Sequence, residues 1–115
     1  MTRVVWLSRH KPLGKQAREL ERLFGPVELI HDPESFTTAD KIVEKFRKSG
    51  ADEMVIVAPL SVIDQLVQRG IRPLYAEMTQ VHEGQYDVDV NGRKFIFQRF
   101  TRIVGIKVEK EELSV

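Results

Sequence analysis

The stretch that decides the fold is V-V-W-L-S-R-H-K-P-L-G, residues 4–14. Its apolar start, residues 4–7, is followed by the polar run S-R-H-K and then by a proline and a glycine at the start of a helical pattern. This order predicts a buried strand that brings polar and cationic side chains to one edge of a sheet. Open α/β sheets bind ligands at the carboxyl ends of their strands, so we expect an anion-accepting site there.

The composition is that of one globular domain. The chain has 115 residues, of which 42% are hydrophobic and 30% charged. That length supports one core, and that apolar content argues against extended disorder. Cysteine is absent, which excludes disulfides, thiol nucleophiles and thiolate metal sites.

Charge is distributed unevenly along the chain. The net charge is +1, but cations gather in residues 9–18 and acidic residues in 109–112. We therefore expect a local basic patch rather than a protein that coats long nucleic acid. No signal-peptide pattern and no apolar run of membrane-spanning length is present in the sequence, so we expect a cytoplasmic protein that does not bind membranes.

Strand and helix patterns alternate over residues 1–81. We expect strands at 4–7, 27–30, 54–58 and 74–78, and helices at 13–24, 38–49 and 61–69. The expected N-caps are Thr37 or Thr38 and Ser61, and the expected C-terminal stops are Gly25, Gly50 and Gly70. The alternation predicts an α/β fold, a small Rossmann-like or flavodoxin-like parallel sheet of strand order 2-1-3-4 with helices on both faces.

A C-terminal antiparallel β-hairpin should follow. Residues 86–90 and 93–100 are joined by Asn91-Gly92, which suits a type I′ turn because both central residues need positive φ. The register predicts the pairs Val88–Phe95, Tyr86–Phe97 and Asp89–Lys94. A further strand is expected at 103–108. The predicted organisation is a single domain, 1–115, with a βα core at 1–81, a hairpin extension at 82–109 and a charged tail at 110–115.

The predicted site lies between the loops at 8–14 and 58–62. Both loops enter helices, and each helix N-terminus favours an anion by about 0.3 to 1 kcal/mol. Arg9 and Lys11 add full charges, and arginine can bind phosphate through two hydrogen bonds. We therefore expect a phosphate-bearing small molecule. The predicted ligand-binding residues are Ser8, Arg9, Leu13, Gly14, Pro59, Leu60 and Ser61.

Structural roles explain several of these residues equally well. Ser8 and Ser61 also fit as N-caps, and the cations of residues 9–18 also fit a solvated face. His10 is a candidate general base, since neighbouring cations favour its neutral form. His31 is a second candidate at the same edge, and His82 lies in an expected turn.

No cofactor and no metal are expected. The histidines are scattered and form no ligand spacing with acidic residues. The G-x-G-x-x-G pattern, the phosphate-binding lysine loop and the G-x-S-x-G elbow are absent from the sequence.

Three short segments resemble a known family. Ser8-Arg9-His10, Pro59-Leu60-Ser61 and Arg69-Gly70 before Leu74 resemble the small Rossmann-like ring nucleases of type III CRISPR systems and, more distantly, CARF-type sensor domains. The resemblance covers residues 4–78. In that family a Leu-Pro pair stands where this chain has Pro59-Leu60, small residues follow the histidine, and the C-terminal hairpin has no counterpart.

The resemblance implies binding of a cyclic oligoadenylate by a homodimer, with slow metal-independent cleavage and a role in antiviral defence. It would make His10 the base that activates a ribose 2′-hydroxyl and Arg9 or Lys11 the group that stabilises the phosphate. Ser8 and the backbone N–H groups of Leu13 and Ser61 would hold the phosphate. Dimerisation would use the apolar hairpin residues Phe95, Phe97 and Phe100.

Two other classes of function remain open. One is a non-enzymatic interaction or regulatory module that docks a partner or a second copy through the hairpin. The other is a phosphatase or nucleotide-metabolising enzyme of flavodoxin-like build. The second lacks a convincing nucleophile, because Asp32 lies beside a proline and Ser8 is too close to His10 to be assumed to form a relay.

Overall fold

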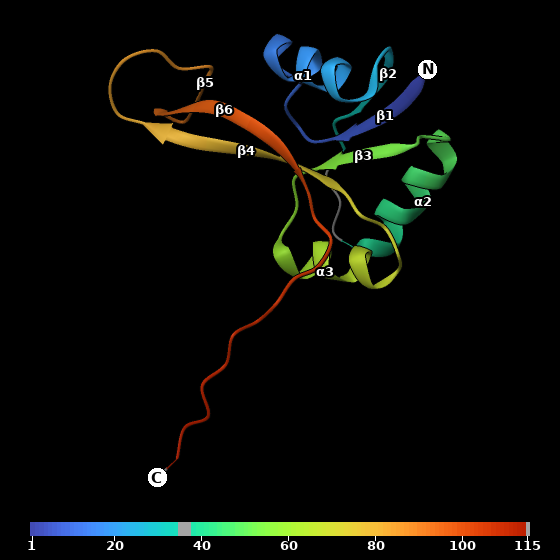
Figure 1. Cartoon of the computed structure of the whole chain (residues 1–115), viewed down its shortest axis with the longest axis vertical. Helices are drawn as coiled ribbons and strands as arrows, with labels where there is room; N and C mark the ends of the chain where they lie inside the picture. The colour runs from blue at the N-terminus through green and yellow to red at the C-terminus, as the bar shows by residue number, and fades with distance from the viewer. Residues whose placement is uncertain (35–37, 115) are drawn as a thin grey trace.

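A six-stranded mixed sheet with helices on both faces forms the fold (Figure 1). The computed structural model describes residues 1–34 and 38–114. The strands are β1 (Thr2–Leu7), β2 (Val27–Asp32), β3 (Glu53–Ile56), β4 (Leu74–Val81), β5 (Val88–Val90) and β6 (Arg93–Arg102), and the helices are α1 (Gly14–Phe24), α2 (Ala39–Ser49) and α3 (Leu60–Gln68). Their order in the sheet is β2-β1-β3-β4-β6-β5, so the first four strands have the predicted order.

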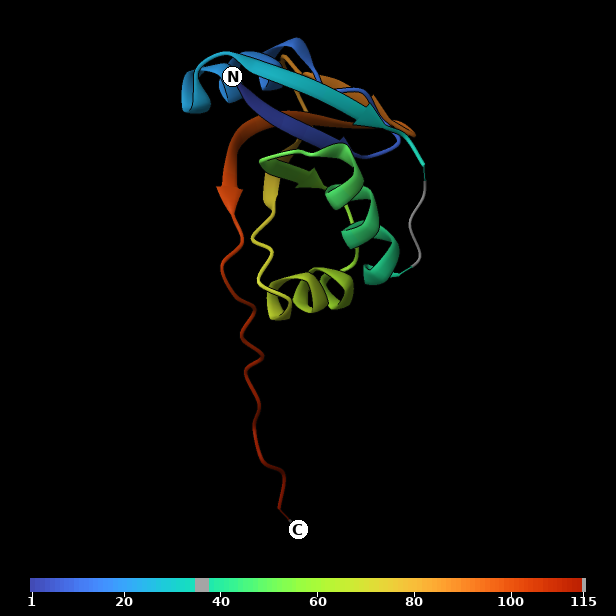
Figure 2. The ribbon, with the colours of Figure 1, turned by 90° about the vertical axis from the view of Figure 1, so that its right-hand side faces the viewer.

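The buried strand β1 divides two apolar clusters. It pairs in parallel with β2 and β3. Val4 and Trp6 face the cluster that contains Leu20 of α1, whereas Val5 and Leu7 belong to the cluster filled by α2 and α3. Figure 2 shows α1 on one side of the sheet and α2 with α3 on the other. The unbroken apolar run of β1 thus reflects burial on both faces.

The helix ends agree with the sequence except at α3. Thr38 caps α2, since its Oγ1 accepts the N–H of Lys41 at 3.3 Å, and Gly50 ends the helix in the left-handed conformation. Thr37 lies outside the described residues. The prediction that Ser61 caps α3 is wrong, because Pro59 holds that position with φ −59° and ψ 149°. Its carbonyl accepts the N–H groups of the first turn, which places Ser61 inside the helix.

The sheet changes direction at β4. β3 ends at Ile56, two residues earlier than predicted, and its ladder with β4 has the single registered pair Val55–Leu74. β4 continues to Val81, past its predicted end, because it pairs with antiparallel β6 along its whole length. In Figure 1 these two strands extend away from β1 and β3 and curve around beneath α1.

The hairpin turn forms as predicted, but one predicted pair does not. Asn91 and Gly92 have φ of 53° and 82°, and the Val88–Phe95 and Asp89–Lys94 pairs are present. The prediction that Tyr86 pairs with Phe97 is wrong. The carboxylate of Asp87 accepts the N–H of Phe97 at 2.7 Å, which ends the ladder, and Tyr86 instead lies beneath the Lys94 ammonium.

A β-bulge places the hairpin rings on one face. The register shifts between Glu77 and Met78, so that β6 contains one extra residue. Phe95, Phe97 and Phe100 consequently oppose three alternate residues of β4 and share a face. Phe97 is buried, and Phe100 packs edge-on against Trp6 with ring centroids 6.0 Å apart. Phe97 and Phe100 therefore belong to the chain's own packing and are not a free dimerisation surface.

The predicted strand at 103–108 is absent. β4 begins opposite Arg102, so the segment beyond has no strand beside it in the described part of the chain. Residues 103–114, which we call the C-terminal arm, lead away from the fold in both views (Figures 1 and 2). Ile103 and Ile106 pack against the α2–α3 cluster, while Val104 and Val108 are 63% and 68% exposed.

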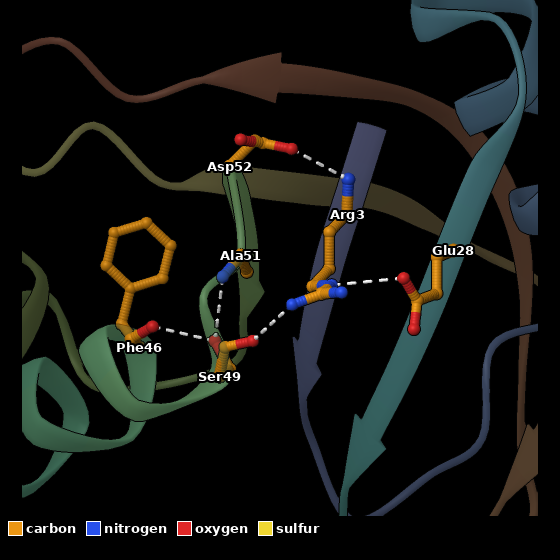
Figure 3. A network of polar contacts seen from close by, with 6 residues as sticks. All are labelled: Arg3, Glu28, Phe46, Ser49, Ala51 and Asp52. Carbon is orange, nitrogen blue, oxygen red and sulfur yellow. Dashed lines mark hydrogen bonds and ion pairs between the residues drawn. The ribbon is translucent and has the colours of Figure 1, made fainter. Parts of the chain in front are cut away.

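Ion pairs close the amino end of the sheet. Arg3 of β1 donates from Nε to Glu28 at 3.0 Å and from Nη1 to the Ser49 carbonyl at 3.2 Å, and its backbone N–H donates to Asp52 (Figure 3). Beside this network, Arg102 holds Glu53 through two hydrogen bonds of 2.9 Å. These contacts join the ends of four strands and α2.

No helix within residues 1–34 and 38–114 combines the length and apolarity needed to cross a membrane.

Candidate functional site

A hollow of about 300 Å³ lies where β1 and β3 end, on the α1 face of the sheet. Most of its lining is apolar, and polar groups come from the loop after β1 and the first turn of α1. We call it the carboxyl-edge hollow. Its lining residues are Trp6, Ser8, His10, Lys11, Leu13, Gln16, Val55, Val57, Ala76, Met78 and Val88.

The buried Trp6 and the half-buried His31 hold the backbone of the loop after β1. The indole Nε1 of Trp6 donates to the His10 carbonyl at 2.9 Å. Nε2 of His31 lies 2.8 Å from the Ser8 carbonyl, which requires that nitrogen to carry the proton. Ser8 Oγ accepts the N–H of His10 at 3.3 Å and so forms a local turn. The hydroxyl proton of Ser8 is not used in this bond and can be donated to another group. The loop is thus fixed through its backbone, and the imidazole of His10 and the ammonium of Lys11 are exposed.

Gln16 links the start of α1 to β4. Its Oε1 accepts the backbone N–H of Leu13 at 2.8 Å, and its Nε2 lies 3.7 Å from the sulfur of Met78. Among the described polar and charged residues, Gln16 is the buried one. The sequence contained a signal for this role that our prediction missed, because a glutamine three residues after an N-cap can accept the N-cap N–H, as in one half of a capping box. The other half is absent here, since the leucine side chain has no acceptor.

The start of α1 carries positive charge that is only partly balanced by acidic side chains. The first turn of the helix contains no acidic residue. The guanidinium of Arg18 lies over that turn, 3.3 Å from where a Cβ on Gly14 would be. Lys15 pairs with Asp87, whereas Lys11 has no ion-pair partner in the described chain. Since the helix dipole adds further positive potential here, the edge favours an anion.

The structure brings together part of the predicted site. Ser8, His10, Lys11 and Leu13 line the carboxyl-edge hollow, and Gly14 begins the adjoining helix. The remaining predicted residues, Arg9, Pro59, Leu60 and Ser61, are not among its lining residues. The chain crosses the edge at Val57, and α3 then packs with α2 on the opposite face. The start of α3 therefore belongs to a different part of the molecule from the hollow.

No family model, curated protein or solved structure matches this chain. Interpretation of the site therefore rests on its own geometry.

That geometry favours binding of a small amphipathic anion. An apolar ring fits against Trp6, Val57 and Met78, and a charged group fits near Lys11 and the first N–H groups of α1. In the described residues no three His, Asp or Glu side chains are grouped so as to hold a metal ion.

Proposed function

We propose that this chain binds a nucleotide in the carboxyl-edge hollow, and that its ligand class is cyclic oligoadenylate. The observation that carries the proposal is the meeting of an apolar hollow with the first turn of α1, which holds no acidic residue, and with Lys11, which has no ion-pair partner among residues 1–34 and 38–114. A nucleotide has the same two parts, a flat base and an anionic phosphate. The 2-1-3-4 order of the first four strands supports a Rossmann-like relationship, in which ligands bind at this edge.

The same site has groups suited to slow phosphodiester cleavage. His10 would take the proton of a ribose 2′-hydroxyl, whose oxygen attacks the adjacent phosphorus while the bond to the 5′-oxygen breaks. The 5′-oxygen takes a proton from water, and the products are a 2′,3′-cyclic phosphate and a 5′-hydroxyl. Lys11 would stabilise the charge on the phosphate oxygens, and the Ser8 hydroxyl would donate to one of them. General base catalysis contributes about 10² to 10⁴-fold, consistent with a slow enzyme.

The single tryptophan provides a direct binding assay. Trp6 is the chain's one tryptophan and lines the hollow, so a bound base should change its fluorescence. We expect saturable changes on titration with cyclic tetra-adenylate or cyclic hexa-adenylate, weakening as salt is added. A flat titration with both, together with no linear product from labelled ligand, would refute the proposal.

Two variants separate binding from cleavage. Lys11→Ala should weaken binding about tenfold, equivalent to about 1.4 kcal/mol. His10→Ala should bind within about twofold of the parent and yield no linear product, since the general base is lost. Lys41→Ala is the matched control, because Lys41 is an exposed lysine on α2 and does not line the hollow. Equal loss of binding in Lys41→Ala and Lys11→Ala would contradict the assigned site.

A further inference from the structure

One edge of β4 is open. On the side toward β3 the ladder contains the Val55–Leu74 pair, and in the described chain no strand pairs with that side from Tyr75 to Val81. Ala76 and Met78 of the same stretch line the carboxyl-edge hollow. An extended segment added here would gain main-chain hydrogen bonds and bury its alternate side chains in an apolar recess.

The C-terminal arm has the sequence of a strand without a strand partner. Residues 103–108, I-V-G-I-K-V, are rich in β-branched side chains. Because side chains alternate along a strand, Val104, Ile106 and Val108 share one side when the arm is extended. Docking of that side in a second molecule therefore exchanges the contact of Ile106 with its own α2–α3 cluster for contacts in the partner. Val104 and Val108 are mostly exposed in the chain alone. The arm starts from a fixed point, since the N–H of Ile103 donates to the Pro73 carbonyl at 2.9 Å.

The charges of the arm and the hollow are complementary. Beyond Val108 the arm carries Glu109, Glu111 and Glu112, all exposed. The rim of the carboxyl-edge hollow carries the exposed Lys11, with Arg18 over the start of α1. Ile103 and Ile106 pack against the α2–α3 cluster, but the far part of the arm leads away from the rest of its own fold (Figure 1), which favours docking to another molecule over docking to its own hollow.

We propose that the C-terminal arm of one copy adds as a strand to the open edge of β4 in a second copy. The side bearing Val104 and Val108 enters the partner's carboxyl-edge hollow, and the acidic end lies against the partner's cations. Reciprocal exchange of the two arms closes a symmetric dimer. The inference does not depend on the nucleotide proposal, although both involve the same hollow, which would make arm and nucleotide competitors.

Solution mass is the first test. Light scattering across a concentration series should give the mass of two chains for the parent and of one chain for Val104→Asp/Val108→Asp. Both positions are exposed, so far-ultraviolet circular dichroism should show that the variant still folds. A parent that remains a single chain at every concentration, or a double variant that keeps the mass of two, would overturn the proposal.

A second pair of variants locates the docking site. Val57 and Leu60 are 66% and 68% exposed apolar residues three positions apart, but Val57 alone of the two lines the hollow. Val57→Asp should shift the chain to the monomer mass, whereas Leu60→Asp should leave the dimer unchanged. Loss of the dimer in both variants, or in neither, would contradict arm docking in the hollow.

Energy transfer between copies tests the exchange directly. The chain has one tryptophan and no cysteine, so Ser114→Cys provides a single position for an acceptor dye. In a labelled chain that also carries Trp6→Phe, no tryptophan donor remains. Mixing this labelled chain with the unlabelled parent should quench the parent's Trp6 emission. A two-chain mass without quenching would refute the exchange. The nucleotide titration is repeated on Val104→Asp/Val108→Asp, whose hollow is free of the arm, so the two proposals can fail separately.

Discussion

The two ends of the sheet are stabilised in different ways. At the amino end, charged side chains pair with one another across strands, as Arg3 does with Glu28 and Arg102 with Glu53. At the carboxyl end, Trp6 and His31 bind backbone carbonyls of the loop after β1, and Lys11 has no ion-pair partner in the described residues. Charged side chains that pair with one another stabilise the fold. A cation beside a hollow that forms no such pair remains available to bind an anionic ligand. The amino end thus has a structural role, and the carboxyl end is the one at which we propose binding.

The largest effect should come from the carboxyl end, at Trp6. Its ring is 4% exposed and packs on Phe100, and its N–H fixes the loop. Trp6→Ala should lower the free energy of unfolding by about 3 to 5 kcal/mol, measured by urea denaturation. Trp6→Phe, which keeps a ring, should lose less. Equal losses in the two variants would show that the ring contributes little.

Gln16 should give the next largest effect. Gln16→Ala leaves the N–H of Leu13 without its acceptor, so we expect a loss of about 1 to 3 kcal/mol in the free energy of unfolding. Gln65→Ala on the exposed surface of α3 is the control and should change stability by less than about 0.5 kcal/mol. A similar result for both would mean that the buried amide is not needed to start α1.

The amino end should show a smaller cost and no effect on binding. Arg102→Ala removes a two-point pair with Glu53 whose side chains are 38% and 19% exposed, and we expect a loss of about 1 kcal/mol. A double-mutant cycle with Glu53→Ala measures the pair itself. The Trp6 fluorescence titration should be unchanged in Arg102→Ala. Weakened ligand binding there would break the division between the two ends.

The smallest effect should be at Glu44 on α2. The hydrogen bond from Lys48 lowers the pKa of Glu44 below its ordinary value of 4.5. A lowered folded-state pKa means that this contribution is present above pH 4.5 and is lost as pH falls through the folded value. Glu44→Gln should therefore slightly reduce stability at neutral pH and make stability depend less on pH in the acid range. Thermal melts at several pH values measure both effects. A steeper acid dependence would contradict this.

Signals contained in short stretches predicted the α/β class, most of the helices and strands and the order of the first four strands, whereas the sheet as a whole is mixed and not parallel. The apolar run of β1, the Asn91-Gly92 turn and the glycine after α2 each specify a local conformation that tertiary packing did not override. The missed features depend on residues distant in the sequence. The ladder ends before Tyr86 because of the Asp87 carboxylate, and the strand expected at 103–108 fails because β4 begins opposite Arg102.

The candidate site also has one part that the sequence could predict and one part that it could not. Ser8, His10 and Lys11 follow one strand directly, so their position at its carboxyl end could be predicted. Met78 and Val88 reach the hollow because the sheet curves after a single β3–β4 pair, and no local pattern reports that curvature. Pro59, Leu60 and Ser61 do not line the hollow, because α3 packs with α2 on the opposite face of the sheet.

The extra residue in β6 sets the direction of side chains that make contacts at both ends of the sheet. Successive side chains of a strand point to opposite faces of the sheet. Deletion of Gln98 would therefore turn each later side chain of β6 to the opposite face. Phe100 would turn away from Trp6, and Arg102 would point away from Glu53. A one-residue deletion would therefore disturb the tryptophan at one end, the ion pair at the other and the direction in which the arm departs, without altering any of the groups that make those contacts.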